Sequence, residues 1–220
     1  MLIIWRYGVK QYMFTIFTSY TPGAGKSYAM VQKAMEEKAK GRNVVVGFLH
    51  SGHRDITKIL EDNGIHGRES GKGMSLPEIM SKAPDLVILD EMGMKVKDYG
   101  FVYEIIDQLL MRGIDVYTST NLKRFEGINP SFKKITGIAI RNTIPDKYLE
   151  MADEVYFIDR EPELMIQDFE SGKLFDENYM ANRIMKKNFK KETLQSYRAI
   201  SKEYLKNMRD SETRLEIISR

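Results

Sequence analysis

The residues with the clearest chemical potential form one glycine-rich run, Pro22-Gly23-Ala24-Gly25-Lys26-Ser27-Tyr28. Glycines let backbone N–H groups turn inward around phosphate oxygens, where a Cβ atom would clash. A lysine in such a loop reaches the β- and γ-phosphates of a nucleotide, and a serine hydroxyl can ligate magnesium. We therefore predict that Pro22 to Tyr28 bind nucleotide phosphates, with Lys26 as the main cation and Ser27 as a magnesium ligand.

The run departs from the standard phosphate-binding motif at one position. The standard spacing places a glycine five residues before Gly25, where this chain has Tyr20, with Ser19 before it. Two alternatives follow. One is a phosphate loop of modified shape, and the other is an ordinary strand-to-helix turn that happens to contain Gly-Lys-Ser.

A second motif, Asp90-Glu91, favours the phosphate loop. These two acids follow Leu86-Val87-Ile88-Leu89, an apolar run typical of a strand buried on both faces of a parallel sheet. Ligands bind at the carboxyl ends of such strands. We predict that Asp90 holds magnesium, usually through water, and that Glu91 polarises an attacking water or senses the γ-phosphate. Glu91 and Lys26 are thus the candidate catalytic residues.

Strand-like and helix-like segments alternate around these motifs. Strands are expected at 12–19, 44–49, 85–90, 114–118 and 154–158, and helices at 25–40, 55–63, after Ser75 with Glu78 as its capping partner, and at 100–112. The alternation predicts an α/β fold with a P-loop NTPase-like parallel sheet flanked by helices. We divide the chain into an N-terminal extension (1–12), a nucleotide-binding core (13–160) and a helical C-terminal appendage (161–220). The extension is expected to be dispensable, because Met13 could itself be a start.

Composition excludes several classes of protein. The 220 residues contain no cysteine, which excludes disulfides and thiolate metal sites. No apolar run approaches the roughly 18 residues that a transmembrane helix needs. The first residues are too short for the core of a signal peptide, so we expect a cytoplasmic protein.

The segment from Arg183 to Arg209 is strongly basic, with nine Lys or Arg and two Glu. Apolar residues recur there at helical spacing, and they are Leu194, Tyr197, Ile200, Tyr204, Leu205 and Met208. Either this stripe packs back on the domain, or the segment docks on an acidic protein surface or an anionic membrane. We expect a docking surface outside the nucleotide site. We do not expect a nucleic-acid partner, which only the basic charge suggests.

Motifs in a specific order run from about Met13 to Arg209. They are Pro22 to Met30, Gly41, Val45 to Gly47, Arg54, Leu89 to Glu91, Gly113 to Thr118, Asn121, Glu126, Asn129, Thr136-Gly137, Arg141, Thr143, Pro145-Asp146, Ala152 to Val155, Gly172-Lys173, Phe189, Leu194 and Arg198. On these residues the chain resembles the N-terminal sensor domain of KdpD-type osmosensitive potassium-channel histidine kinases. The resemblance implies a regulatory domain that binds ATP and Mg²⁺ in potassium or turgor two-component signalling, with a protein partner. It implies no histidine kinase activity in this chain.

Three segments depart from the family pattern. Ser19 stands where the family usually has glycine, His50 to Arg54 replaces a Glu-Thr-His-Gly-Arg segment, and Met92 to Tyr99 replaces a polar, proline-containing insertion. The last two departures, and the lack of an obvious arginine finger, predict weak ATPase activity at most. Alternative functions are a P-loop enzyme that transfers a group to a small substrate, similar to a corrinoid adenosyltransferase or a nucleoside kinase, and a nucleic-acid-linked ATPase.

Further residues have two interpretations each. Thr118 to Asn121 either sense the γ-phosphate or form a polar loop in which Asn121 caps the next helix. Arg54 and Arg141 could contact phosphate, since a guanidinium matches phosphate geometry. His50 and His53 could bind a metal, but the loop supplies no firm third ligand.

Overall fold

The computed structural model describes residues 12–49, 54–65, 75–96, 99–137, 140–175, 183–208 and 213–220. Its strands are β1 (Phe14–Ser19), β2 (Val44–Phe48), β3 (Leu86–Leu89), β4 (Lys95–Val96), β5 (Gly100–Phe101), β6 (Asp115–Asn121), β7 (Glu154–Asp159) and β8 (Arg214–Ser219). Its helices are α1 (Lys26–Ala39), α2 (Arg54–Asp62), α3 (Leu76–Met80), α4 (Val102–Leu110), the 3-10 turn η1 (Leu122–Arg124), α5 (Asn129–Thr136), α6 (Lys147–Met151), α7 (Pro162–Glu170), α9 (Arg183–Asn188) and α10 (Lys191–Asn207).

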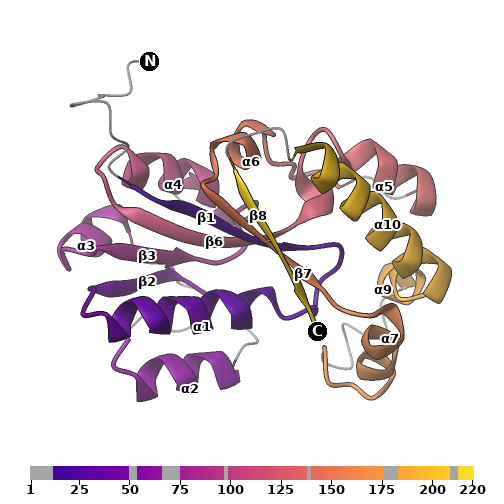
Figure 1. The fold of residues 1–220 in the computed structure, drawn as a ribbon, viewed down its shortest axis with the longest axis horizontal. Coiled ribbons are helices and arrows are strands. Elements are labelled where there is room, and N and C mark those ends of the chain that lie inside the picture. Colours follow the sequence, from indigo (N-terminus) through magenta and orange to yellow (C-terminus); the bar gives the residue numbers. More distant parts are fainter. Residues whose placement is uncertain are drawn as a thin grey trace. The chain divides into compact units, whose positions relative to one another are not determined.

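Six strands form one sheet in the order β2-β3-β6-β1-β7-β8, with helices flanking it (Figure 1). The ladders β2–β3, β3–β6 and β7–β8 are parallel, whereas β4 and β5 form a separate antiparallel pair. The α/β class and the helix-flanked sheet that the sequence predicted are therefore confirmed. In the described part of the chain, no helix is both long and apolar enough to span a bilayer.

The chain forms two compact units. The first comprises Met1–Phe17 and Ser27–Thr120, and the second comprises Thr18–Lys26 and Asn121–Arg220. The chain passes between them at three peptide bonds, one of which joins Lys26 to Ser27. The glycine-rich run therefore belongs to the second unit up to Lys26, and Ser27 and Tyr28 belong to the first.

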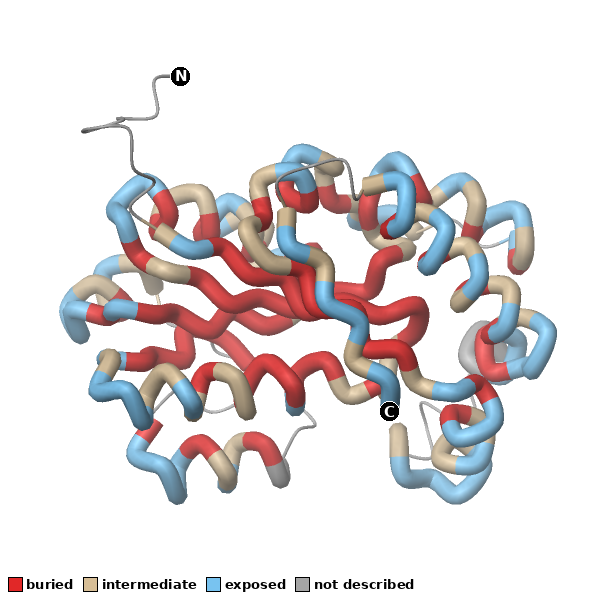
Figure 2. Tube along the Cα trace, viewed as in Figure 1, coloured by how far each residue is buried: buried red, intermediate tan, exposed pale blue. Residues whose placement is uncertain are grey.

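In the first unit, the strands form the core. β2 and β3 are buried along their whole length, as Figure 2 shows, because β3 lies between two strands and helices cover the faces. Their apolar, β-branched composition suits this position. Met13 extends the pairing beyond β1, since its N–H donates to Asp115 at 2.6 Å and its carbonyl accepts from Val116 N at 3.0 Å.

Local signals predicted the elements of the first unit well. The capping box of α3 is confirmed, because Ser75 N donates to Glu78 Oε2 at 2.7 Å and Glu78 N donates to Ser75 Oγ at 3.3 Å. The helix expected at 100–112 begins later, since Gly100 and Phe101 pair with Val96 and Lys95 in the β4–β5 hairpin. Two-residue strands carry too little pattern to be predicted from sequence.

The sequence predicted a helical C-terminal appendage at 161–220, and the structure adds a strand to the helices there. Arg214–Ser219 form strand β8, which runs parallel to β7 with Leu215 opposite Val155 and Ser219 opposite Asp159 (Figure 1). The ladder with β7 stabilises this strand by pairing its backbone groups. Six residues with two β-branched isoleucines do not reveal such a partner by themselves.

Helix α10 packs within the second unit through its apolar stripe. Leu194, Tyr197 and Leu205 are buried, and the Tyr197 ring lies 4.7 Å from that of Phe132 on α5. The stripe therefore follows the first of the two interpretations and is not available for docking, because it belongs to the core of the unit. Docking through the basic side chains stays a prediction.

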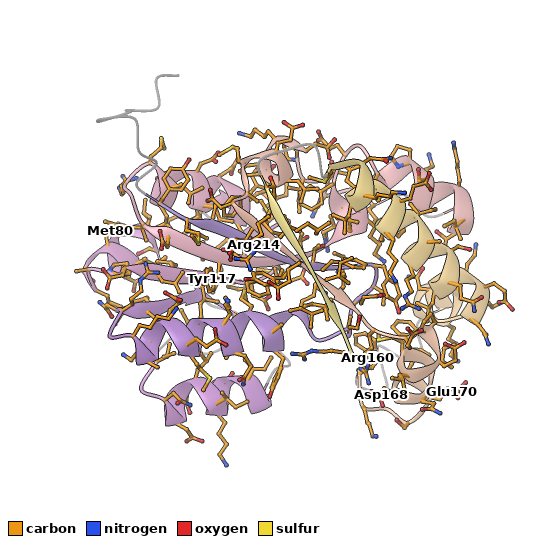
Figure 3. All side chains as sticks on the ribbon, in the orientation of Figure 1. Met80, Tyr117, Arg160, Asp168, Glu170 and Arg214 are labelled. Atoms are coloured by element: carbon orange, nitrogen blue, oxygen red, sulfur yellow. The ribbon has the colours of Figure 1, made fainter. Side chains whose placement is uncertain are left out.

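Ion pairs connect α10 and α7 to the end of β7. Arg160 pairs with Asp168 of α7, and both are labelled in Figure 3. Arg198 of α10 holds Asp159 through two hydrogen bonds of 2.6 and 2.9 Å, and Lys202 approaches the same carboxylate to 2.6 Å. The C-terminal end of β7 is therefore fixed by charges from two helices.

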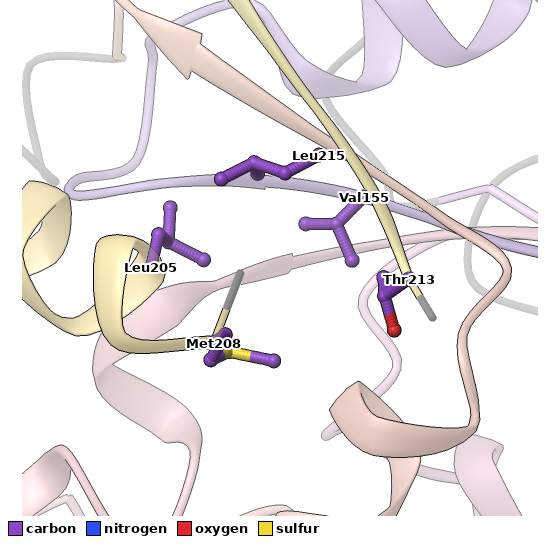
Figure 4. A pocket seen from close by; sticks show the side chains of 5 residues that line it. All are labelled: Val155, Leu205, Met208, Thr213 and Leu215. Atoms are coloured by element: carbon purple, nitrogen blue, oxygen red, sulfur yellow. The ribbon is translucent and has the colours of Figure 1, made fainter. Parts of the chain in front are cut away.

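A small apolar pocket lies where α10 meets β7 and β8. It is lined by Val155, Leu205, Met208, Thr213 and Leu215 (Figure 4). Its lining includes a single polar group, the Thr213 hydroxyl. The pocket therefore has few hydrogen-bonding groups with which to bind a polar ligand.

Candidate functional site

The glycine-rich run forms a turn between β1 and α1 in which two glycines have positive φ angles. Gly23 has φ 83° and Gly25 has φ 99°, conformations that disfavour any side chain. A Cβ atom on Gly23 would lie 3.1 Å from Leu174 Cδ1, and one on Gly25 would lie 3.3 Å from Arg220 Nη1. Both glycines are thus required by backbone conformation and by close neighbours from distant segments.

Tyr20, which stands in place of the motif glycine, is a core residue of the second unit. Its side chain is fully buried, and its hydroxyl donates to the carbonyl of Arg160 at 2.6 Å. Burial raises the pKa of the Tyr20 hydroxyl far above its usual value, so the group stays protonated and acts as a donor. Ser19 Oγ donates to Thr21 O at 2.6 Å and so stabilises the turn locally.

Lys26, the first residue of α1, is almost fully buried. Its ammonium donates to Asn121 Oδ1 at 3.0 Å, and each of the two side chains is 5% exposed. Asn121 precedes η1 but makes no side-chain capping hydrogen bond. The capping interpretation of Asn121 is therefore wrong, because its amide oxygen faces the lysine ammonium instead.

In the first unit, Ser27 and Asp90 come together as the two motifs predicted. Ser27 Oγ lies 3.1 Å from Asp90 Oδ1 and 3.2 Å from Oδ2, and the Asp90 side chain is fully buried. Ser119 of β6 donates a second hydroxyl hydrogen bond to Asp90. A carboxylate and a hydroxyl at this separation are the hard oxygen ligands that Mg²⁺ prefers.

Glu91 has an unusual backbone conformation for its residue type. Its φ is 49°, and the only other non-glycine residue with positive φ in the described ranges is Ala83. Its N–H donates to Ser119 Oγ at 3.4 Å, and Met92 N donates to Ser119 O at 2.8 Å. Such conformations cost on the order of 1–3 kcal/mol and cluster at functional sites, so the strained backbone is consistent with a functional role for Glu91.

The residues fit a magnesium nucleotide by their chemistry. The second unit contributes two glycines with positive φ and one buried ammonium, and the first unit contributes a serine hydroxyl next to a buried carboxylate. The hydroxyl of Thr21, just before the glycine-rich run, is buried without a hydrogen-bond partner among the described residues, as are those of Thr15, Thr18, Thr120 and Ser201. Since five hydroxyls share this property, it does not mark the turn as a ligand site.

The other predicted residues differ in exposure, and some of them lie outside the described residues. Tyr28 is 42% exposed on the first turn of α1, Ala24 is buried, and Arg141 is exposed. His50, His53 and the Arg54 side chain lie outside the described residues. Within the described ranges, no group of three His, Cys, Asp or Glu is placed to hold a metal ion.

Sequence reasoning missed two neighbours of the loop, Leu174 and Arg220. Leu174 directly follows Gly172-Lys173, one of the motifs on which the family resemblance rests. That motif was the one sequence signal that could have drawn attention to this segment. Arg220 follows β8, a strand that was not predicted. Neither position is near the loop in sequence, so only the fold brings them to it.

Comparisons with known proteins identify relatives over most of the chain. A family model described as "Osmosensitive K+ channel His kinase sensor domain" matches residues 10–208. The sensor protein KdpD of Clostridium acetobutylicum is 31% identical over 198 residues, which are 84% of this chain and 22% of that protein. The sensor protein KdpD of Escherichia coli is 28% identical over 197 residues, which are 84% of this chain and 22% of that protein.

A Synechocystis sp. protein, named provisionally as a sensor protein KdpD, is 29% identical over 197 residues, which are 84% of this chain and 53% of that protein. The chain thus spans between 22% and 53% of the length of these relatives.

Proposed function

Because the chain belongs to the KdpD family of osmosensitive K⁺ channel histidine kinase sensor domains, we propose that it is a nucleotide-dependent regulatory domain. It binds ATP with Mg²⁺ and passes the state of the bound nucleotide to a protein partner in potassium signalling. The comparisons support the signalling context, and the residues of the loop support the nucleotide.

Each residue has a distinct role in this proposal. The backbone N–H groups of the turn from Gly23 to Gly25 bind phosphate oxygens, and the α1 N-terminus adds a partial positive charge. Lys26 pairs with the β- and γ-phosphates, and Asn121 orients its ammonium through the 3.0 Å hydrogen bond. Ser27 and Asp90 hold magnesium, which when bound neutralises phosphate charge.

The observation that carries the proposal is the contact between Ser27 and Asp90. These residues come from motifs far apart in the sequence, and the fold places their oxygen atoms 3.1 Å apart. An ordinary turn that contained Gly-Lys-Ser by chance would have no reason to face the acid that ends β3. The contact therefore favours the phosphate loop over that alternative.

Turnover is expected to be weak. Glu91 is the candidate to polarise a water, and it is half-buried at the end of β3. Signalling by occupancy requires only that ATP binds and is released, so rapid hydrolysis is not needed. A turnover above roughly 1 s⁻¹, which is within the usual range for enzymes, would favour the small-substrate P-loop enzyme instead.

Titration of the full chain with ATP and Mg²⁺ tests the proposal. Lys26→Ala should weaken binding at least about tenfold, or about 1.4 kcal/mol, because it removes the main cation of the loop. Lys38→Ala, in the last turn of the same helix, is the matched control and should bind like the wild type. Equal affinity of Lys26→Ala and wild type would exclude the phosphate-loop assignment.

A further inference from the structure

Arg220 brings a guanidinium to the phosphate loop from a distant part of the second unit. Its Nη1 atom lies 3.3 Å from the position that a Cβ atom on Gly25 would occupy. Gly25 has no side chain, so no atom of the loop residue stands between the guanidinium and the turn. The Arg220 side chain is exposed.

The backbone of Arg220 is fixed by β7. Ser219 is the last residue of the β7–β8 ladder and stands opposite Asp159. Arg220 N then donates to Asp159 O at 3.1 Å, and Arg220 O accepts from Glu161 N at 3.4 Å. The side chain therefore begins from a defined position, which lowers the entropy cost of a directed contact.

We propose that Arg220 contacts the phosphates of the nucleotide bound by the loop, an inference that rests on the proposed function. A guanidinium stays charged at all relevant pH values and matches two phosphate oxygens in a planar fork. An arginine from the same chain is a known way to stabilise phosphate charge. Arg220 would thus add to the loop a second cation that the sequence did not reveal, from a position directly after β8 and beyond the family match at 10–208.

The inference also assigns a role to β8. A contact between Arg220 and phosphate links nucleotide occupancy to the pairing of β8 with β7. Arg214, at the opposite end of the same strand, pairs with Glu154 of β7 at 3.5 Å. Arg214 serves as a matched control for Arg220. It carries the same charge, but it lies at the other end of the β7–β8 ladder from Ser219.

The experiment compares ATP affinity with Mg²⁺ in the full-length wild type, Arg220→Gln, Arg214→Gln and Lys26→Ala. Arg220→Gln should weaken ATP binding about tenfold, and Arg214→Gln should stay within about twofold of the wild type. If Arg220→Gln lowers the unfolding temperature, Arg220→Met replaces it in the test, because methionine keeps an apolar side chain at this position. The same loss of ATP affinity, about tenfold, is then expected.

The outcomes separate the two proposals. Wild-type binding that Lys26→Ala weakens at least about tenfold but Arg220→Gln leaves within about twofold overturns the role of Arg220 and retains the proposed function. Absence of ATP binding in the wild type overturns the proposed function and the role of Arg220 together. Equal loss of ATP affinity in Arg220→Gln and Arg214→Gln also overturns the role of Arg220. The loss of a positive charge at either end of β8 would then explain the effect.

Discussion

At the scale of single residues, Tyr20 occupies the position of the motif glycine and is part of the core. The loop keeps positive φ angles at Gly23 and Gly25, where close neighbours exclude a Cβ atom. Tyr20 precedes that part of the turn and places its ring in the core, with its hydroxyl on Arg160 O. The position of the motif glycine is therefore a core position in this protein.

We predict that restoring the motif glycine destabilises the protein. Tyr20→Gly should lower the free energy of unfolding by about 3–5 kcal/mol, because it removes a large, fully buried side chain. Tyr20→Phe should cost only about 1 kcal/mol, because it removes one hydrogen bond. Urea unfolding measures both.

The control for this pair is Tyr28→Phe, since the Tyr28 side chain is 42% exposed and its change should stay within about 0.5 kcal/mol. A Tyr20→Gly variant as stable as the wild type would show that Tyr20 is not part of the core.

At the scale of secondary-structure elements, the end of β7 gathers charge from two helices. Asp159 is buried, Arg198 and Lys202 of α10 contact its carboxylate, and Arg198 also reaches Glu161 at 2.5 and 2.6 Å. Burial raises the pKa of the Asp159 carboxyl, but the hydrogen bonds from Arg198 and Lys202 outweigh burial and lower it overall. The carboxylate therefore stabilises the packing of α10 while it is ionised.

The stabilisation from Asp159 should depend on pH. Since its folded pKa lies below the unfolded value of about 3.9, its contribution is fully present above roughly pH 5 and is lost as pH falls through the lower folded pKa. Asp159→Asn should therefore cost about 2–4 kcal/mol at pH 7, and the difference from the wild type should shrink steadily below about pH 4.

Lys191→Gln provides the comparison, because Lys191 and Glu163 are 55% and 52% exposed and solvent screens such a surface pair, so its loss should change stability little. Chemical unfolding at several pH values measures both variants. A cost for Asp159→Asn that is the same at pH 7 and pH 3 would contradict the ionic explanation.

At the scale of the whole molecule, ligand binding and stability are linked. The chain passes from one unit to the other at the Lys26–Ser27 bond, within the glycine-rich run. A ligand that binds only the folded chain raises its free energy of unfolding. Thermal unfolding therefore reports on nucleotide binding by the complete protein.

We predict that ATP with Mg²⁺ stabilises the protein by about 2.7 kcal/mol at a hundredfold excess over the dissociation constant. Lys26→Ala, with at least about tenfold weaker binding, should keep at most about 1.4 kcal/mol of this rise at the same ATP concentration, and EDTA should reduce the rise in the wild type. AMP, which lacks the β- and γ-phosphates, is the matched ligand and should stabilise much less. An equal rise with AMP would mean that the loop does not recognise these phosphates.

The sequence by itself determined the features that depend on local patterns. The alternation of apolar runs and amphipathic segments predicted the α/β sheet, the spacing of Ser75 and Glu78 predicted a helix start, and the apolar run before Asp90 placed an acid at a strand end. These features follow from periodicity and from short side-chain reach, both of which a few neighbouring residues set.

Only the tertiary structure decided which distant residues meet. The hydrogen bond of Lys26 to Asn121, the burial of Tyr20 against Arg160, and the approach of Arg220 to Gly25 join segments with no local relation. β8 is the clearest case, because its pairing with β7 supplies the backbone hydrogen bonds that a six-residue segment cannot make alone. Side-chain neighbours are set by ladders and packing, and these appear only when the whole chain folds.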